Sequence, residues 1–322
     1  MSNTEFNADE ASHGAASNGT ADVLIPRQVP MGGPGGLLVQ RVLPKRQRSL
    51  VGAWCFVDHY GPTSTIMDVP PHPHTGLQTV TWLFSGTVEH RDSAGVHVIV
   101  RPGEVNLMTS GAGICHSEVS FGAEMLHGVQ LWVALPEDAR NGGRDFGHYA
   151  PEAISLPGLR ARVFLGELMS NRSPLSTFTP LLGAELLIDS LATIEFDVEP
   201  AFEHGFLCDT GELEVMGVPV ETAQLSFHPA GLSRLQLRNL SDQPARALLL
   251  GGAPFAEDLV MWWNFVGRSH DEIAQYRQQW QNGDARFGSV DGYRGAVQRL
   301  SAPPLPTTRL LPRHASQIPR RG

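Results

Sequence analysis

The stretch VPPHPHTG (residues 69–76), which runs directly into LQTVTWLFSG (77–86), decides the fold of this chain. Its second part alternates, with Leu77, Thr79, Thr81 and Leu83 at one set of positions and Gln78, Val80, Trp82 and Phe84 at the other. Residues two apart on a strand share a face, and both faces carry apolar side chains. We therefore expect a strand with one face inside a barrel and the other against a neighbouring sheet.

Short apolar runs continue on both sides of this stretch, namely GLLVQRVL (36–43), AWCFVDHY (53–60), HVIVRPGE (97–104) and GVQLWVAL (128–135). They are rich in the β-branched and aromatic residues that strands prefer, and the 34 glycines and 24 prolines supply turns between them. A second set of such runs begins near Leu181 and ends with ARALLLGG (245–252). The spacing predicts a second sandwich or barrel of similar size, so the chain is predicted to be all-β.

One segment near the C-terminus departs from this pattern. Ser269 followed by Glu272 is a capping box, and Ile273, Tyr276 and Trp280 follow at helical spacing, with a glycine at 283 as a stop. This pattern predicts a helix over about 270–282.

The composition is typical of a globular protein. Of the 322 residues, 41% are hydrophobic and 18% are charged, and the net charge of −9 argues against direct nucleic-acid binding. The three cysteines are scattered and odd in number, so no disulfide framework is indicated and a reducing compartment is expected. No apolar run approaches the length of a membrane span. We expect a monomeric, cytoplasmic protein that does not bind membranes.

Both ends of the chain are predicted to be unstructured. Residues 1–22 have neither the basic nor the apolar region of a signal peptide, and their composition is that of a disordered tail. Residues 301–322 are rich in Pro and Arg, which predicts a flexible tail.

Two short motifs carry the ligands of a candidate metal site. His72 and His74 form one pair at i and i+2, and His116 and Glu118 form another. If the two strands pair side by side, three imidazoles and one carboxylate face a single point, which suits a divalent transition metal. In an octahedral site this donor set leaves two positions open for water, dioxygen or a chelating substrate. A structural zinc site would instead be closed and usually rich in thiolates.

A less specific interpretation stays open at this point. A single HxH pair in a Pro-rich loop is often a pair of solvent-exposed histidines, but the second pair and the turn glycines at 111 and 113 favour the metal site. Cys115 should face away from the metal, and we interpret it as a buried structural thiol rather than a redox sensor. Trp82 and Trp132 are interpreted as core residues. No spacing assigns a role to His59, His90, His97 or His204.

Four segments resemble the pirin family, in the expected order: FVDH (56–59), PHPHTGLQTV (71–80), GAGICHSE (111–118) and HGVQLWV (127–133). Together with Gly166-Glu167 and the segment from Trp262 to Ile273, the resemblance covers roughly residues 25–290. The combination of motifs is distinctive. The chain departs from many pirins at Ala112, where they carry an arginine.

The resemblance implies a bicupin, which consists of two antiparallel cupin (jelly-roll) β-barrels face to face. It implies a metal-binding cupin domain over residues 23–150, a degenerate cupin domain without metal over 151–258, and a segment containing the short helix over 259–300. The implied ligands are those chosen from spacing: His72, His74, His116 and Glu118. The expected metal is Fe(II), with Ni, Cu, Mn and Zn left open.

His127 and Gln130 lie on the last of the resembling segments. They are candidates for hydrogen-bond partners of the ligands or for the pocket wall, because metal-bound histidines usually donate their other ring nitrogen to such groups. Ordinary core packing is the alternative for both.

The resemblance implies two functions of different classes. Some pirins act as flavonol (quercetin) 2,3-dioxygenases, which would make a flavonol and dioxygen the substrates and Glu118 the catalytic residue that accepts the proton of the 3-hydroxyl. Other pirins are described as transcriptional co-regulators or partners of metabolic enzymes, so the alternative is a redox-sensitive metal-binding regulator that binds a protein partner. A zinc hydrolase is disfavoured because no separate acid or base accompanies the ligands.

Overall fold

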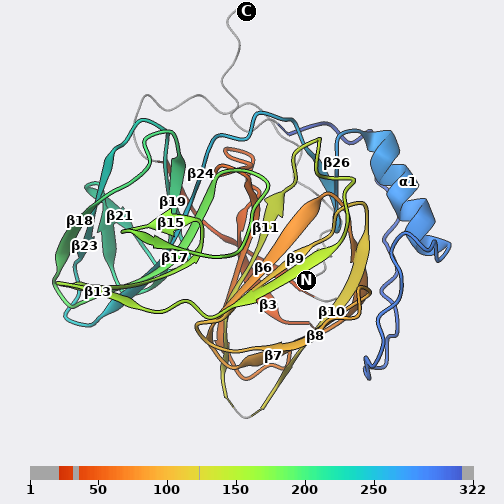
Figure 1. Cartoon of the computed structure of the whole chain (residues 1–322), viewed down its shortest axis with the longest axis horizontal. Helices are drawn as coiled ribbons and strands as arrows, with labels where there is room; N and C mark the ends of the chain where they lie inside the picture. The colour runs from red at the N-terminus through yellow and green to blue at the C-terminus, as the bar shows by residue number, and fades with distance from the viewer. Residues whose placement is uncertain (1–21, 32–35, 123, 314–322) are drawn as a thin grey trace, which may run out of the picture.

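The computed structural model describes residues 22–31, 36–122 and 124–313, and within them it consists of antiparallel strands and one α-helix (Figure 1). The strands form two barrels side by side, each made of one seven-stranded and one four-stranded sheet. The predicted all-β fold class, with two antiparallel barrels and a short C-terminal helix, is confirmed. The predicted tail over residues 1–22 lies outside the described residues except for Asp22, as do residues 314–322.

The first barrel contains the stretch from which the fold was predicted. Its seven-stranded sheet runs, in spatial order, β12 (Asp145–Tyr149), β9 (Val105–Thr109), β6 (Leu77–Ser85), β11 (Leu126–Ala134), β4 (Trp54–Thr63), β3 (Leu38–Leu43) and β2 (Arg27–Pro30). Its four-stranded sheet runs β5 (Asp68–His74), β10 (Ile114–Phe121), β7 (Thr87–Asp92) and β8 (His97–Val100).

The second barrel repeats this arrangement. Its seven-stranded sheet runs β1 (Asp22–Leu24), β22 (Leu225–His228), β19 (Glu203–Thr210), β24 (Ala245–Gly252), β17 (Leu181–Ile188), β14 (Leu159–Leu165) and β13 (Ile154–Leu156). Its four-stranded sheet runs β18 (Thr193–Asp197), β23 (Arg234–Asn239), β20 (Leu213–Val215) and β21 (Val218–Val220). The strand β1 therefore adds to the second barrel although it comes first in the chain.

Two hairpins of short strands stand outside the main sheets. They are β15 (Glu167–Leu168) with β16 (Asn171–Arg172), and β25 (Val260–Trp262) with β26 (Phe265–Gly267).

The two seven-stranded sheets pack against each other. Trp82 of β6 stacks on Phe164 of β14 with ring centroids 4.8 Å apart, and the indole of Trp54 in β4 donates to the carbonyl of Leu182 in β17 at 3.2 Å. Because Trp82 points into this interface while its neighbour Thr81 points into the first barrel, β6 is buried on both faces. This agrees with the prediction made from its alternating pattern.

The predicted helix over about 270–282 is confirmed as α1 (His270–Gln281). The side chain of Ser269 caps it by accepting from the backbone N–H of Glu272 at 3.2 Å. The return bond of the capping box is displaced, because Glu272 Oε2 accepts from the N–H of Arg268 at 2.6 Å. Ile273 and Trp280 lie on the buried face. Within the described part of the chain, no helix is long and apolar enough to cross a membrane.

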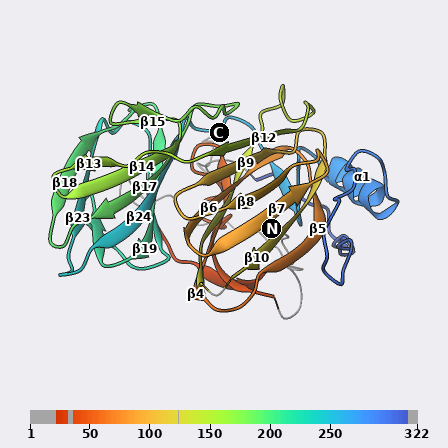
Figure 2. The ribbon, with the colours of Figure 1, turned by 60° about the horizontal axis from the view of Figure 1, so that its bottom comes forward.

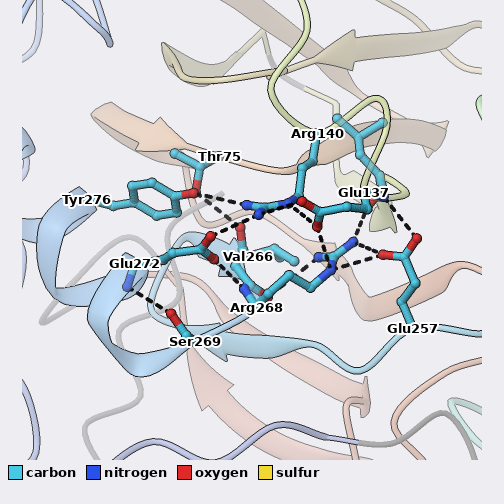
Figure 3. Close-up of polar contacts among 11 residues, drawn as sticks. Thr75, Glu137, Arg140, Glu257, Val266, Arg268, Ser269, Glu272 and Tyr276 are labelled. Atoms are coloured by element: carbon cyan, nitrogen blue, oxygen red, sulfur yellow. Dashed lines mark hydrogen bonds and ion pairs between the residues drawn. The ribbon is translucent and has the colours of Figure 1, made fainter.

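A chain of ion pairs fastens α1 to the loop that follows β11 (Figure 3). The guanidinium of Arg140 binds Glu137 at 2.6 Å and Glu272 of the helix at 2.8 Å. Arg268, just before the helix, pairs with Glu257 and lies 3.7 Å from Glu137. Two arginines and three carboxylates therefore join segments that are far apart in the sequence.

The stretch after α1 also packs on the protein as far as residue 313. The backbone N–H of Leu300 donates to the carbonyl of Pro71 at 2.8 Å, and Arg277 of α1 donates to the carbonyl of Pro303 at 2.5 Å. Arg309 forms an ion pair with Asp271 at 2.9 Å. Part of the predicted flexible tail over 301–322 thus lies along the helix.

Candidate metal centre

The two motifs lie on neighbouring strands, which is the pairing that a shared site needs. β5 and β10 pair antiparallel, and His116 lies directly opposite His72. A bulge after His116 brings Glu118 opposite Val69. In Figure 2, β5 lies at the side of the first barrel that faces α1. Since cross-strand partners share a face of the sheet, His72 and His116 point the same way, into the barrel.

The three imidazole rings of the motifs are clustered. Ring centroids are 4.4 Å apart for His72 and His116, 5.0 Å for His72 and His74, and 5.0 Å for His74 and His116. One nitrogen from each ring lies within 4.8 Å of the others, so the three can hold a metal ion together. All three side chains are fully buried.

The hydrogen bonds of the rings determine which nitrogens remain available. Nδ1 of His72 donates to the carbonyl of Pro70 at 2.8 Å, and Nδ1 of His74 donates to the carbonyl of Asn264 at 3.1 Å. A neutral imidazole has one N–H, so in both rings Nε2 carries the lone pair. The Nε2 of His72 is buried and has no hydrogen-bond partner among the described residues.

Nε2 of His74 faces Nε2 of His116 at 3.1 Å. The Nδ1 atom of His116 lies 3.4 Å from Nδ1 of His90. Burial lowers the pKa of His72, His74 and His116 well below the usual value, which keeps the rings neutral. The buried Nε2 lone pairs of His72 and His74 lie beside the ring of His116, and a metal cation would satisfy such an arrangement, so the residues present fit such a group.

Glu118 approaches this cluster from β10. Its carboxylate forms a second group of possible ligand atoms with His116 and His90, again within 4.8 Å. The hydroxyl of Thr81 on β6 donates to Oε1 of Glu118 at 3.0 Å and lies 2.8 Å from the side-chain oxygen of Gln130. Glu118 is buried, with 1% of its surface exposed, and the hydroxyl of Thr81 orients its carboxylate from across the barrel.

The structure places the two candidate partners of the ligands, His127 and Gln130, in different groups. Gln130 reaches the site through Thr81. His127 belongs to a different group, in which its Nε2 lies 2.6 Å from Asp209 of the second barrel. The two residues are three apart in β11, so they point to opposite faces of the strand, Gln130 into the first barrel and His127 toward the second.

Sequence reasoning missed several neighbours of the ligands. His90 contacts His116, and its Nε2 lies 3.2 Å from Asp92. His90 and Asp92 are themselves an i, i+2 pair on β7, and that spacing was a readable signal. The carbonyl of Asn264, which binds His74, had no signal in the sequence because it is a backbone group 190 residues away.

The β25–β26 hairpin brings that carbonyl into place. The N–H of Val266 donates to the carbonyl of Thr75 at 3.1 Å, directly after His74 (Figure 3). The ring of Trp132 meets that of His74 edge to face at 5.1 Å. The segment before α1 thus supports a ligand of the candidate metal site.

Two arginines occupy the surroundings of Ala112, where many pirins carry an arginine in the turn itself. Arg286 donates to the carbonyl of Ala112 at 2.5 Å, and Arg144 donates to the carbonyl of Gly113 at 2.7 Å. Positive groups are therefore present beside this turn, supplied by other segments.

Cys115 packs away from the histidines, in a cluster with Trp262, Trp263 and Phe265. Only 2% of it is exposed, and burial raises the pKa of its thiol to about 12. The interpretation as a buried structural thiol agrees with this environment.

A surface cleft of about 990 Å³ opens elsewhere, in the second barrel. It is lined by the segment from Gly166 to Leu182 and by residues around Phe202, and none of the candidate metal ligands borders it.

Comparisons with known proteins agree with this geometry. The family model described as Pirin matches residues 36–133, and the model described as Pirin C-terminal cupin domain matches residues 183–288. A Pseudomonas aeruginosa protein named "Putative quercetin 2,3-dioxygenase" is 44% identical over 282 residues, which are 84% of this chain and 87% of that protein. A pirin-like protein of Caulobacter vibrioides is 34% identical over 80% of this chain and 92% of its own length.

A solved structure extends the likeness to three dimensions. The crystal structure of a quercetin 2,3-dioxygenase from Acinetobacter baumannii superimposes with a TM-score of 0.84 at 38% identity. The match covers 89% of this chain and 96% of that one.

Proposed function

The chain belongs to the pirin family, and from that premise we propose that it is a flavonol 2,3-dioxygenase of the quercetin 2,3-dioxygenase type. The proposal includes one divalent transition metal, with Fe(II) as the expected ion, held by His72, His74, His116 and Glu118. The observation that carries the metal site is the pair of buried Nε2 atoms of His74 and His116, which face each other at 3.1 Å.

The donor set suits this chemistry. Three neutral imidazoles and one carboxylate match non-haem iron and its neighbours in the first transition series better than Mg²⁺ or Ca²⁺. A metal of this kind would supply a Lewis acid that binds the 3-hydroxyl oxygen of a flavonol and lowers the pKa of that hydroxyl.

Glu118 is the residue that we propose to accept the 3-hydroxyl proton. Its carboxylate groups with His116 and His90, and one of its oxygens already accepts from Thr81 at 3.0 Å. Thr81 would hold the carboxylate in a single orientation, which fixes the direction from which it can accept the proton. The surrounding barrel excludes water, since the four proposed ligands are at most 1% exposed.

The choice of substrate rests on the relatives. The Pseudomonas and Acinetobacter proteins carry the name of an enzyme that acts on quercetin, and both align over most of this chain. Since one fold can support several activities, a direct assay has to decide whether this chain shares theirs.

The test is aerobic incubation of iron-loaded protein with quercetin, with substrate loss and carbon monoxide release as readouts. We expect turnover by the wild type and loss of both metal content and turnover in His72→Ala. His97→Ala is the matched control, because His97 lies on β8 of the same sheet with its side chain about half exposed (49%).

Two results would count against different parts of the proposal. Full metal content in His72→Ala would remove His72 from the ligand set. An iron-loaded wild type that consumes no quercetin would leave the metal site standing and reject flavonol oxygenation, which would favour the regulatory alternative.

A further inference from the structure

A second cluster of possible metal ligands lies between the two barrels. His59 of β4 and His127 of β11 come from the first barrel, and Asp209 of β19 comes from the second. The Nε2 atoms of both histidines lie 2.6 Å from the same oxygen, Oδ1 of Asp209. These Nε2 atoms are 3.4 Å apart.

The cluster is buried and held in place by its surroundings. Exposed fractions are 3% for His59, 6% for His127 and 1% for Asp209. The other carboxylate oxygen of Asp209 accepts from Arg246 at 3.1 Å, and the ring of Phe84 packs against His127 at 4.9 Å. The ligand atoms are therefore gathered before any ion binds.

The charge of the cluster also favours a cation. Oδ1 of Asp209 lies 2.6 Å from the Nε2 atoms of both His59 and His127, and Oδ2 accepts from Arg246, so both oxygens act as acceptors, as in an ionised carboxylate. Arg246, the nearby positive group, is shared with a second carboxylate, Glu185, at 3.2 Å. The group between the barrels therefore keeps negative charge facing the two imidazoles.

We propose that His59, His127 and Asp209 form a second metal site, of the zinc class, that joins the two barrels. Two imidazoles and one carboxylate are a common donor set for Zn²⁺, with a water as fourth ligand. In a tetrahedral site with bonds of about 2.05 Å, neighbouring ligand atoms are about 3.3 Å apart. The spacing of the two histidines, 3.4 Å, already matches this value.

Binding an ion requires only a small change in the positions of the ligand atoms and of the ring protons. The two N–O distances of 2.6 Å are those of hydrogen bonds, and they must open by about 0.7 Å for an ion to enter. Each Nε2 must also give up its proton to Nδ1. In His59 that atom is buried and has no partner among the described residues, so it can take the proton.

The proposed zinc site differs from the proposed catalytic centre in its ligands and in its effect, which is to stabilise the protein. None of its members belongs to the group of His72, His74 and His116. Because its ligands come from both barrels, an ion bound there links them, and it should raise the thermal stability of the whole chain.

Stoichiometry with Co²⁺ and Zn²⁺ tests the proposal. We expect the wild type to bind two equivalents and the His72→Ala/His116→Ala chain to keep one. That remaining Co²⁺ should give the strong visible absorption of four-coordinate cobalt, and Zn²⁺ should raise the melting temperature of this chain.

Two further variants identify the ligands. In the same background, His59→Gln keeps a hydrogen-bond donor for Asp209 but removes the imidazole, and it should weaken Zn²⁺ binding by more than about 100-fold. Asp209→Asn should do the same. Asp197→Asn is the matched control, because Asp197 is a surface carboxylate of the same barrel with its side chain 77% exposed, and it should change nothing.

The outcomes separate this proposal from the proposed function. One equivalent in the wild type and none in the His72→Ala/His116→Ala chain would overturn the second site and leave the first intact. Unchanged binding in His59→Gln and Asp209→Asn would also overturn it. If neither of these two variants folds, the count in the His72→Ala/His116→Ala chain decides alone. Loss of quercetin turnover has no bearing on any of these readouts.

Discussion

Replacing His204 with leucine should make the protein less sensitive to acid. His204 of β19 lies directly opposite His228 of β22 in the second barrel, and both are buried, with 0% and 3% exposed. Neither ring nitrogen of His204 has a hydrogen-bond partner among the described residues. Burial lowers the pKa of each histidine from 6.5 to about 4. Protonating either ring in the folded state is therefore unfavourable.

The direction of the pH effect follows from this shift. The pKa in the folded state lies below that in the unfolded state, so the unfolded chain takes up the proton first as the pH falls. The contribution of each neutral histidine to the free energy of unfolding is fully present above pH 6.5. It is lost progressively as the pH falls from 6.5 to about 4. By this linkage, acidification from pH 7 to pH 5 costs about 2 kcal/mol for each histidine.

Urea unfolding at pH 7 and pH 5 measures the effect, with a chelator present so that metal binding does not contribute. We expect His204→Leu to lose about 2 kcal/mol less than the wild type over this interval, and His204→Leu/His228→Leu to lose about 4 kcal/mol less. His97→Leu controls for the loss of a histidine at an exposed position. The reasoning is refuted if the wild type and His204→Leu lose equal stability between the two pH values.

Three further predictions concern other parts of the molecule. Thr81→Val removes the hydroxyl that donates to Glu118 and should lower flavonol turnover about tenfold at unchanged metal content, because a hydrogen bond to a charged group contributes about 1.5–3 kcal/mol. Equal kcat in the variant and the wild type would contradict this role. Arg41→Met leaves the fully buried carboxylate of Asp58 without its bidentate partner at 2.7 and 2.8 Å, and should reduce the free energy of unfolding by about 3–5 kcal/mol in urea titrations. The three buried cysteines should resist a thiol reagent until the protein is unfolded, in keeping with the pKa of about 12 for Cys115, and rapid labelling of the native protein would disagree.

Local patterns carried much of the prediction. The alternation over 77–86 indicated a strand buried on both faces, and β6 has Thr81 facing Glu118 and Trp82 facing Phe164. The capping box at Ser269 placed the start of the helix correctly. Both signals are short-range, because side-chain direction repeats every two residues in a strand and every 3.6 in a helix.

Long-range contacts were not predictable in this way. The three members of the second cluster, His59, His127 and Asp209, have no common spacing, and Asp209 comes from the other barrel. The carbonyl that holds His74 comes from the hairpin before α1. Such neighbours depend on how the sheets close and how the barrels pack, and the spacing of residues in the sequence does not indicate either.

The sequence by itself determined the two i, i+2 pairs, and with them the four proposed ligands and the family to which they point. It could do so because a strand presents alternate residues on one face wherever the strand lies. Only the tertiary structure decided that β5 pairs with β10, that the rings meet at their Nε2 atoms, and that a second group of ligands forms between the barrels. These features arise from strand register and from the contact of two sheets, and both are set by the packing of the whole chain.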